Sequence, residues 1–583
     1  MIFGLHWIDF SIILLYFVIT LYIGVIYGGR KTKTLSDFFV AGGKWGALVS
    51  FIFIFASALA GNEAVVVAGG AYETGLSGVW YWWSFLFATP IYFLFSTYFR
   101  RARVYNISEF IEMRYEKYIA SLYAVVAGII CILFVGMFLL AVAKILTGLT
   151  SFSVTTCIWV ITVVVSAYVF SGGMMSTLLT DIFQGLVVLI ILCFIMLPFL
   201  WMEVGGWETF HQYSTQNPEI WNLVDPERMT IYTILALNLS ALVGGIAAPW
   251  IYNWIAVSKN ERAATQCAWG HLWKRIITLL FAIYGILFAI YKPGMADPEL
   301  SWGIVMNEIL PVGLIGLIII SFFAAAMSSA ATFSTTSSAM LTNYLYRKIL
   351  STGKSNSHYL RAGRIWAVVS VLLAAYLCNY IGTIREYIKL AMTLLSFIGI
   401  PIYFGIFWKR SNNTGMWFSL LAGIITYIAV VTTTMLTSKL NFFEAIEPSF
   451  EPAVFLSTAM ALIGMIAGTI FGKAQNTIKL KRFYIIMNTP VGEENRLVQA
   501  GISLPALVDA GMMKDEKESL NHEMIHQYYA EDSKDKIFGA DSQIEIRKEP
   551  TLPWYYPGFF RVIAACVALV AGTWLVGRIL FIW

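Results

Sequence analysis

Asn62 and Glu63 are polar residues inside a long apolar stretch, where an unpaired polar group costs free energy. The residues before them, 56–61, are mostly small (ASALAG). Small residues permit a helix to break inside a membrane, and a break frees backbone carbonyls to bind a ligand. Close helix packing through small residues is the alternative, but it does not explain Glu63. The pattern therefore indicates a binding site near the middle of this stretch.

A second group consists of hydroxyl residues within the apolar stretch 309–346. A single Ser or Thr usually bonds to the carbonyl four residues earlier in its own helix. A dense cluster next to a broken helix could instead form a cage of neutral oxygens for Na⁺. The residue types alone leave both readings open. The hydroxyl residues are Ser328, Ser329, Thr332, Ser334, Thr335, Thr336, Ser337, Ser338 and Thr342.

Two charged residues near the ends of apolar stretches have simpler explanations. Asp181 directly precedes the stretch 182–202. A carboxylate at the start of a helix faces the positive end of the helix dipole, so Asp181 taken alone indicates a structural role. Lys144 lies near the outer end of its stretch, and we expect its ammonium group to reach the membrane interface.

His522, Glu523 and His526 match the HExxH pattern, which on a helix places two histidines on one face for zinc. The pattern falls in a polar segment with few apolar residues to hold it, so we interpret it as a chance match and expect no metal other than Na⁺. No phosphate-binding loop, dinucleotide fingerprint or nucleophile constellation is present, which argues against ATP-driven pumping. We predict no enzymatic activity.

The composition shows what must position these residues. Of the 583 residues, 58% are hydrophobic and 13% are charged, about half the charged share of a soluble protein. Apolar runs of about 20 residues recur along the chain, so we predict an all-α polytopic protein in the lipid bilayer, with about 14 transmembrane helices and no nucleic-acid partner. The predicted spans are 8–28, 46–72, 76–99, 119–147, 153–171, 182–202, 230–256, 272–291, 309–346, 364–384, 388–408, 413–436, 452–472 and 555–582. The span 309–346 is too long for one straight crossing, so it should tilt, bend or extend into water.

Lysine and arginine residues orient these spans. About 20 of them, including Lys274 and Arg275, fall in one set of alternating loops, against about 5 in the other set. The positive-inside rule makes the first set cytoplasmic and places both chain termini outside. The polar segment 473–553 then lies in the cytoplasm, where we expect a short amphipathic helix or a partly ordered linker.

Several short motifs, in this order, make the sequence resemble the sodium:solute symporter family, which includes bacterial sugar, sialic-acid and proline symporters. The resemblance covers about residues 9–472 and rests on their order and spacing. The motifs lie at 36–43, 72–75, 108–110, 114–115, 326–329, 346–348, 407–410 and 414–415, with further likeness to longer members at 482–484 and 489–494.

This resemblance implies a LeuT-type fold, in which five helices are repeated upside down, with extra terminal helices. The implied parts are an extra helix and cytoplasmic loop (1–45), the first repeat (46–203), the second repeat (204–410), two extra helices (411–472), the cytoplasmic segment (473–553) and a last helix (554–583).

The implied function is sodium-coupled import of a small polar organic solute (a sugar, amino acid or organic acid) by alternating access, in the cell (inner) membrane. Na⁺ is the coupling ion, and we expect no cofactor. The alternatives are a proton-coupled or uncoupled carrier, or a solute sensor derived from such a carrier. The sequence predicts neither the solute nor the oligomeric state.

The resemblance also implies a sodium site formed by the backbone carbonyls of Ala56, Leu59 and Ala325 and the hydroxyls of Ser328 and Ser329. Some members have a second sodium site, and Asp181, Ser328 and Thr332 fit its pattern. Ala331 stands where that pattern has a further hydroxyl residue.

The solute pocket resembles that of the sugar carriers least. Glu63 stands where those carriers have Gln, and an aromatic gate residue is replaced near Val243. The carboxylate expected on the next helix is replaced by aromatic residues. A cavity with a carboxylate and tryptophans would suit a cation or a stacked sugar ring. The pocket candidates are Asn62, Glu63, Trp80, Trp82 and Trp83.

Overall fold

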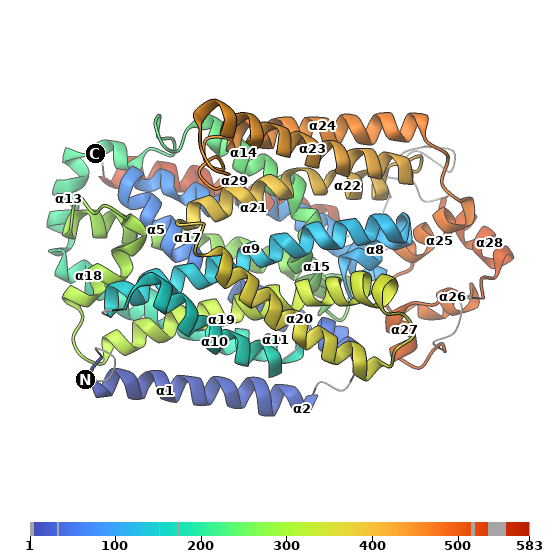
Figure 1. Ribbon diagram of the computed structural model, residues 1–583, viewed down its shortest axis with the longest axis horizontal. Helices are drawn as coiled ribbons and strands as arrows, with labels where there is room; N and C mark the ends of the chain where they lie inside the picture. Colours follow the sequence, from blue (N-terminus) through green and yellow to red (C-terminus); the bar gives the residue numbers. More distant parts are fainter. Residues whose placement is uncertain are drawn as a thin grey trace.

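The computed structural model describes residues 5–31, 34–150, 152–171, 174–514, 519–533 and 555–581. These residues form helices and connecting loops, with an isolated β-bridge between Trp45 and Ser258. Helices dominate because the bilayer interior offers no water to backbone N–H and C=O groups, so a spanning segment must satisfy them itself. In Figure 1 the long helices run side by side along the long axis of the molecule.

Ten helices within the described residues are long and apolar enough to cross a membrane, or up to 12 if two bent pairs are each counted as one span. One bent pair, Ala47–Ser57 with Gly61–Ala102, contains two predicted spans, 46–72 and 76–99. The shorter apolar helix Val154–Phe170 matches the span predicted at 153–171. With these, each predicted span coincides with a helix.

The two bends occupy corresponding places in the two predicted repeats. In the first repeat, α4 (Ala47–Ser57) and α5 (Gly61–Thr74) meet at 52°. In the second, α14 (Ile231–Gly244) leads through a 3₁₀ turn (Gly245–Ala247) into α15 (Pro249–Ala256), with a bend of 50°. Proline suits the start of α15 because the missing N–H group has no partner in the first helical turn.

The other helices of the repeats follow in order along the chain. Those of the first repeat are α6 (Trp80–Trp83) with α7 (Thr89–Ala102), α9 (Lys117–Leu149), α10 (Val154–Ser171), and α11 (Met174–Val188) continued by a π-helix (Leu189–Met196) and α12 (Leu197–Glu203). Those of the second repeat are α17 (Gln266–Tyr291), α19 (Leu314–Met340), α20 (Asn356–Leu377), and α21 (Ile384–Ile398) with α22 (Ile400–Phe407).

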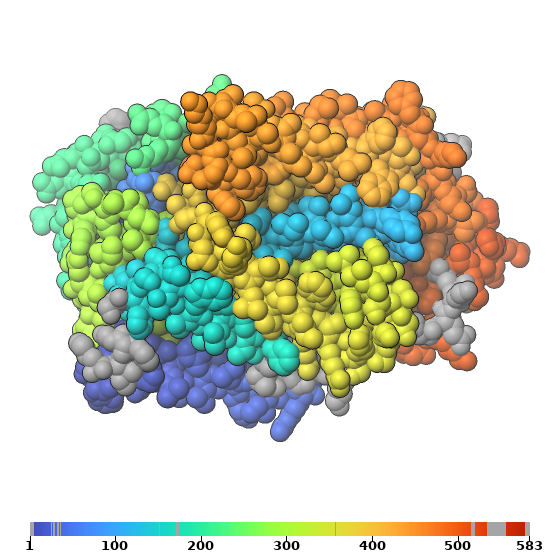
Figure 2. All heavy atoms as spheres, in the orientation of Figure 1, coloured from blue at the N-terminus to red at the C-terminus, as the bar shows by residue number. Residues whose placement is uncertain are grey.

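Burial places α9 at the centre and the additional helices at the lipid boundary. Of the most apolar part of α9, 89% is buried, against 11% for α29 (Tyr555–Phe581). Figure 2 shows α1 (Trp7–Leu21) along one long edge of the molecule, and α23 (Asn413–Ser438) with α24 (Phe450–Phe471) along the other. The functional site is therefore expected around α9, in the repeats.

One predicted boundary differs from the structure in an informative way. The span predicted at 182–202 begins at Met174, so Asp181 lies two turns inside α11 and not at its start. Ser176, Thr177, Thr180 and Asp181 are all buried against protein, which hydropathy alone cannot reveal. The long stretch 309–346 extends as expected, because α19 continues into a π-helix (Leu341–Leu350). The last turn of this π-helix carries Arg347 and Lys348.

The segment after residue 472 is more ordered than the sequence suggests. It forms α25 (Thr477–Asn488), α26 (Glu494–Gln499), α27 (Pro505–Asp509) and α28 (His522–Ser533). Its apolar residues Phe483, Ile485 and Ile486 are fully buried, because α25 packs on α7 and α8 (Ile107–Arg114). Figure 1 shows these helices at one end of the molecule and both chain termini at the other. The part 534–553 lies outside the described residues.

An ion pair joins this segment to the transmembrane helices. Arg103 donates to the Glu494 carboxylate at 3.0 Å and to the carbonyl of Thr489 at 3.2 Å. Burial of Glu494 opposes its ionisation, but the Gly492 N–H group and the Arg103 guanidinium outweigh burial and hold the pKa of Glu494 below its usual range. The contact therefore contributes stability above the usual pKa of a Glu, and this stability is lost as the pH falls through the lowered pKa.

Glu494→Gln removes one charge of this pair and should loosen the segment 477–514. We expect about tenfold faster limited proteolysis there, since a hydrogen bond to a charged group contributes about 1.5 kcal/mol. The matched control is Glu493→Gln, at an exposed neighbouring residue. Equal cleavage rates in the two variants would show that the Arg103–Glu494 pair does not hold the segment.

Candidate sodium and solute sites

The break between α4 and α5 lies between two other helices of the bundle. The chain leaves the helical path at 58–60, where the Leu59 N–H group donates to the Ala56 carbonyl at 3.0 Å. On one side, Gly61 approaches α19 so closely that a Cβ there would lie 3.5 Å from the Cβ of Ala325. On the other side, Gly185 of α11 contacts Ala56, and a Cβ there would clash. The predicted sodium ligands of the broken helix and of α19 are thus brought together.

The hydroxyls of α19 divide into two kinds. Thr336 bonds to the Thr332 carbonyl of its own helix at 2.7 Å, and Ser338 bonds to the Gly363 carbonyl. By contrast, the hydroxyls of Ser328, Ser329 and Thr332 are buried and make no hydrogen bond. A buried polar group without a partner costs about 1–3 kcal/mol. The hydroxyls that the sequence assigned to sodium are therefore among those that the fold leaves unpaired, together with Ser334 and Thr342.

Asp181 lies at the same junction. The Ser57 hydroxyl donates to one of its carboxylate oxygens, and the other oxygen has no hydrogen-bond partner. Ser328 and Thr332 of α19 also face this carboxyl group. Ser57, Asp181, Ser328 and Thr332 thus form one buried cluster of oxygens. The sequence interpretation missed Ser57, although its position directly before the break was a signal for it.

Glu63, the carboxylate predicted in the solute pocket, is already paired. It forms an ion pair with Lys274 of α17 and accepts a hydrogen bond from Thr278 of the same helix. Both charged side chains are fully buried. The sequence analysis had counted Lys274 and Arg275 as loop cations, whereas α17 carries both inside the protein. Glu63 therefore ties α5 to α17 and does not present a free negative charge.

A small cavity of about 40 Å³ lies next to the break. Of the predicted pocket residues, only Trp82 lines it. Asn62 donates to Met137 sulfur at 2.8 Å, and the indole N–H groups of Trp80 and Trp83 donate to backbone carbonyls. The lining residues are Ser57, Ala58, Ala60, Trp82, Phe85, Tyr92, Phe134, Phe138, Trp250, Ile251, Trp254, His271, Arg275, Ser329 and Phe333.

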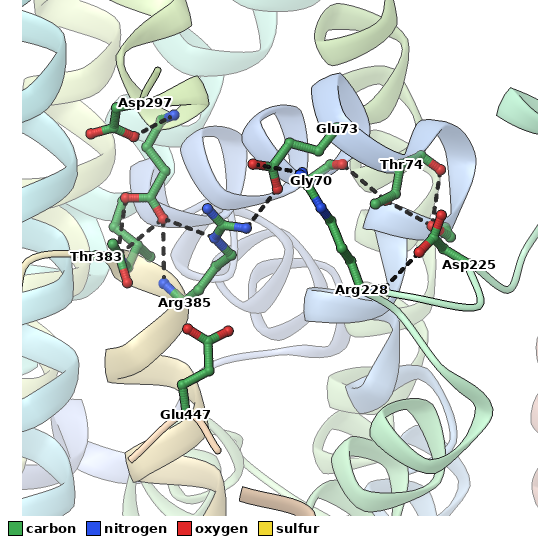
Figure 3. Close-up of polar contacts among 12 residues, drawn as sticks. Gly70, Glu73, Thr74, Asp225, Arg228, Asp297, Thr383, Arg385 and Glu447 are labelled. Carbon is green, nitrogen blue, oxygen red and sulfur yellow. Dashed lines mark hydrogen bonds and ion pairs between the residues drawn. The ribbon is translucent and has the colours of Figure 1, made fainter. Parts of the chain in front are cut away.

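A network of ion pairs joins the ends of helices on the side away from α25–α28. Lys144 of α9 binds Asp297 at 2.9 Å and Glu299 at 2.6 Å, so it is buried in a network and does not reach the interface as expected. Figure 3 shows Glu73, at the end of α5, between two further cations. These are Arg385 of α21 at 2.6 Å and Arg228 at 2.9 Å.

The HExxH residues lie on α28 at the opposite end. His526 Nδ1 is 2.8 Å from the Lys481 ammonium nitrogen, a contact that a metal-bound histidine nitrogen could not make. Across the described ranges, no group of three or more His, Cys, Asp or Glu side chains is arranged to hold a metal ion. The pattern therefore gains no support as a zinc site.

Glu63→Gln should destabilise the protein by about 3–5 kcal/mol, because it leaves the Lys274 charge buried without a partner. The double variant Glu63→Gln with Lys274→Met removes both charges and should recover most of this loss. Thermal unfolding of the detergent-purified protein measures both effects. If the double variant were no more stable than the single one, the pair would not be the reason for the burial of these charges.

The comparisons with known proteins agree with this architecture. The pattern of the Sodium:solute symporter family matches residues 38–423, more than half of the chain. The chain is 25% identical to sodium/proline symporter 2 of Staphylococcus saprophyticus, over 73% of this chain and 85% of that protein. It is 23% identical to the sodium/proline symporter of Staphylococcus aureus strain Newman, over 82% and 97%.

Among solved structures, a Na⁺-coupled sialic acid symporter has a TM-score of 0.65 at 20% identity, covering 80% of this chain and 99% of that one. Mhp1, a nucleobase-cation-symport-1 family transporter, has a TM-score of 0.51 at 12% identity, covering 78% and 99%. These likenesses establish the LeuT-type fold that the two matching breaks suggested.

Residues of both broken helices line one small cavity, and the family pattern covers both helices. The protein is accordingly a multi-pass secondary transporter and not an enzyme, with sodium as its coupling ion and a small organic solute as its cargo. This chain belongs to the sodium:solute symporter family.

Proposed function

We propose that the coupling sodium binds where the α4–α5 break meets α19, at the carbonyls of Ala56, Leu59 and Ala325 and the hydroxyls of Ser328 and Ser329. The observation that carries this assignment is that both hydroxyls are buried without a hydrogen-bond partner beside a helix break. Na⁺ would provide the partner that the protein does not, and a broken helix is where transporters of this kind bind their ions.

A second sodium binds at Asp181, Ser328 and Thr332, with Ser57 as a further ligand. The support is an unpaired carboxylate oxygen facing unpaired hydroxyls in a fully buried cluster. The Ser57 hydroxyl replaces the one that is missing at Ala331. The carboxylate also neutralises the charge of the ion, which lowers the cost of holding a cation inside the membrane.

Ion and solute are coupled through residues that their sites share. Ser57 and Ser329 belong to the sodium sites and also line the cavity, and Ala58 and Ala60 of the break line it as well. Sodium that fixes the break therefore fixes one wall of the cavity, so each ligand strengthens binding of the other. The membrane potential then contributes about 2.3 kcal/mol per charge per 100 mV to solute accumulation.

The cargo is a small polar organic solute, and the relatives make proline and sialic acid the first to test.

The chain is oriented with both termini on the outer side of the cell membrane and residues 473–553 in the cytoplasm. The distribution of Lys and Arg supports this orientation, as does the position of α25–α28 opposite the termini in Figure 1. Residues 46–203 and 204–410 form the two inverted repeats.

Proteoliposomes test the coupling. Labelled L-proline and sialic acid are supplied with an inward gradient of sodium, of potassium or of protons. We expect at least one of them to accumulate above equilibrium with sodium alone. Accumulation that follows the proton gradient, or equilibration without any gradient dependence, would instead identify a proton-coupled or an uncoupled carrier.

Ser328→Ala and Ser329→Ala should each weaken sodium binding about tenfold, because each removes one ligand oxygen worth about 1.4 kcal/mol. Binding of ²²Na⁺ to the purified protein measures this directly. Ser321→Ala is the matched control, since Ser321 is equally buried on α19 but bonds to the Leu317 carbonyl of its own helix. If the control lost as much affinity as the two variants, the site assignment would be wrong.

Asp181→Asn should remove the second ion and leave the first. The wild type should then bind about twice as many sodium ions per chain as the variant at saturation. An unchanged stoichiometry would mean that Asp181 has a structural role only.

A further inference from the structure

The polar groups of the cavity are mainly hydrogen-bond donors that lack acceptors. Arg275 Nε, Trp254 Nε1 and the Tyr92 hydroxyl are buried and make no hydrogen bond, and all three residues line the cavity. An arginine Nε and an indole Nε1 can only donate. No Asp or Glu is among the described residues that line this cavity. The cavity therefore lacks the acceptors that would satisfy its own donors.

The charges around the cavity do not balance. Glu63 and Lys274 cancel each other, and Asp181, which lies beside the cavity residue Ser57, is neutralised by the proposed second sodium. This leaves the Arg275 guanidinium, 2% exposed, as a buried cation. Its bonds go to the Trp82 carbonyl at 2.9 Å and to His271, and no acidic side chain in the described residues bonds to it. A guanidinium stays charged in a protein, and a buried charge without a counter-ion is costly.

His271 does not supply the missing negative charge. Because Arg275 can only donate, His271 Nε2 must accept, and the proton then sits on Nδ1, which bonds to the Thr89 hydroxyl at 2.9 Å. The imidazole is therefore neutral. Together with the Trp82 carbonyl it holds the guanidinium of Arg275, one of the residues that line the cavity. The same cavity shares Ser57 and Ser329 with the proposed sodium sites.

We propose that the transported solute carries a carboxylate, which Arg275 binds as its counter-ion, with Trp254 and Tyr92 as further donors. This inference rests on the proposed function, because it takes the cavity beside the sodium sites as the solute site. A carboxylate fits because its two coplanar oxygens match the planar donor array of a guanidinium. Binding removes both the charge imbalance and the unpaired donors.

The rest of the solute faces aromatic rings. Phe134, Phe138, Trp250 and Phe333 form one contiguous wall, with ring centroids 4.6 to 5.2 Å apart in the pairs that involve Phe333. This wall favours an apolar or ring-shaped body and offers nothing to a second charge. In this conformation a volume of about 40 Å³ holds about one water, so the aromatic wall must move outward when a solute enters.

The wall and the guanidinium together exclude other classes of solute. An organic cation would meet the like charge of Arg275, and a neutral sugar would leave that charge uncompensated. The solute class is therefore a small monocarboxylate with a compact apolar or cyclic body.

Matched acid and amide pairs test this proposal on the detergent-purified full-length protein. The probes are cyclohexanecarboxylate and its amide, and phenylacetate and its amide, each titrated in sodium and in potassium. The readout is the thermal unfolding midpoint. We expect at least one carboxylate to stabilise the protein in sodium and its amide to bind at least about 30-fold more weakly, the lower end for truncating a buried charge pair.

Variants assign the effect to the cavity. Arg275→Gln should lose the preference for acid over amide, while stabilisation by sodium alone stays as in the wild type and shows that the variant is folded. Trp254→Phe keeps an aromatic side chain but removes the indole N–H donor, and should weaken carboxylate binding about fivefold. It provides the test if Arg275→Gln does not fold.

Each remaining outcome has one meaning. Amides that bind as well as acids, or carboxylate binding unchanged in Arg275→Gln, would overturn the assignment of Arg275. Stabilisation by sodium without any carboxylate effect across the panel would overturn the carboxylate inference and leave the proposed sodium site standing. No stabilisation by sodium would overturn the proposed function itself.

Discussion

The interruption of the helix at residues 58–60 is the constraint on which the rest of the structure depends. Inside a membrane, a backbone group that loses its helical partner cannot turn to water. In the fold, the break lies between α11 and α19. Gly185 of α11 packs against Ala56, and Gly61 packs against Ala325 of α19. Around the break lie hydroxyls that make no hydrogen bond and the Asp181 carboxylate, of which one oxygen has no partner. Such an arrangement is unfavourable by itself and favourable around a cation, which supports the proposed sodium site at the break.

Buried charged groups beside the cavity play the same part for the solute that the unpaired oxygens play for the ion. Glu63 on the second half of the broken helix is bound to Lys274, so α5 and α17 are held together at this point. The next residue of α17, Arg275, faces the cavity with no acidic partner. One helix therefore carries both a cation with an acidic partner and a cation without one. A bound sodium ion would pair with the free oxygens at the break, and a bound carboxylate would pair with the Arg275 guanidinium.

Sequence reasoning was sufficient where a local pattern reports a local property. The break was predicted from small residues at 56–61, and the fold from a resemblance carried by the order of short motifs. The density of hydroxyls on one helix left two readings open, and their assignment to sodium came from the resemblance and stays a prediction. Sequence reasoning was insufficient where the burial or pairing of a residue depends on residues that are distant in the sequence. Asp181 seemed to start a helix because hydropathy cannot register the buried polar residues before it. Lys274 and Arg275 were counted as loop cations because their partners, Glu63 and Trp82, are about 200 residues away. The segment after residue 472 has too few apolar residues for a core of its own. Its order comes from packing of α25 on α7 and α8, which the sequence of the segment does not reveal.

A pair of experimental structures, determined in sodium and in N-methylglucamine, tests the central claim most directly. The account predicts a density in sodium alone, enclosed by the carbonyls of Ala56, Leu59 and Ala325 and the hydroxyls of Ser328 and Ser329. Without sodium, these hydroxyls should turn to other partners or the break should change its angle. An identical junction in both media, or an ion bound elsewhere in the bundle, would contradict the account.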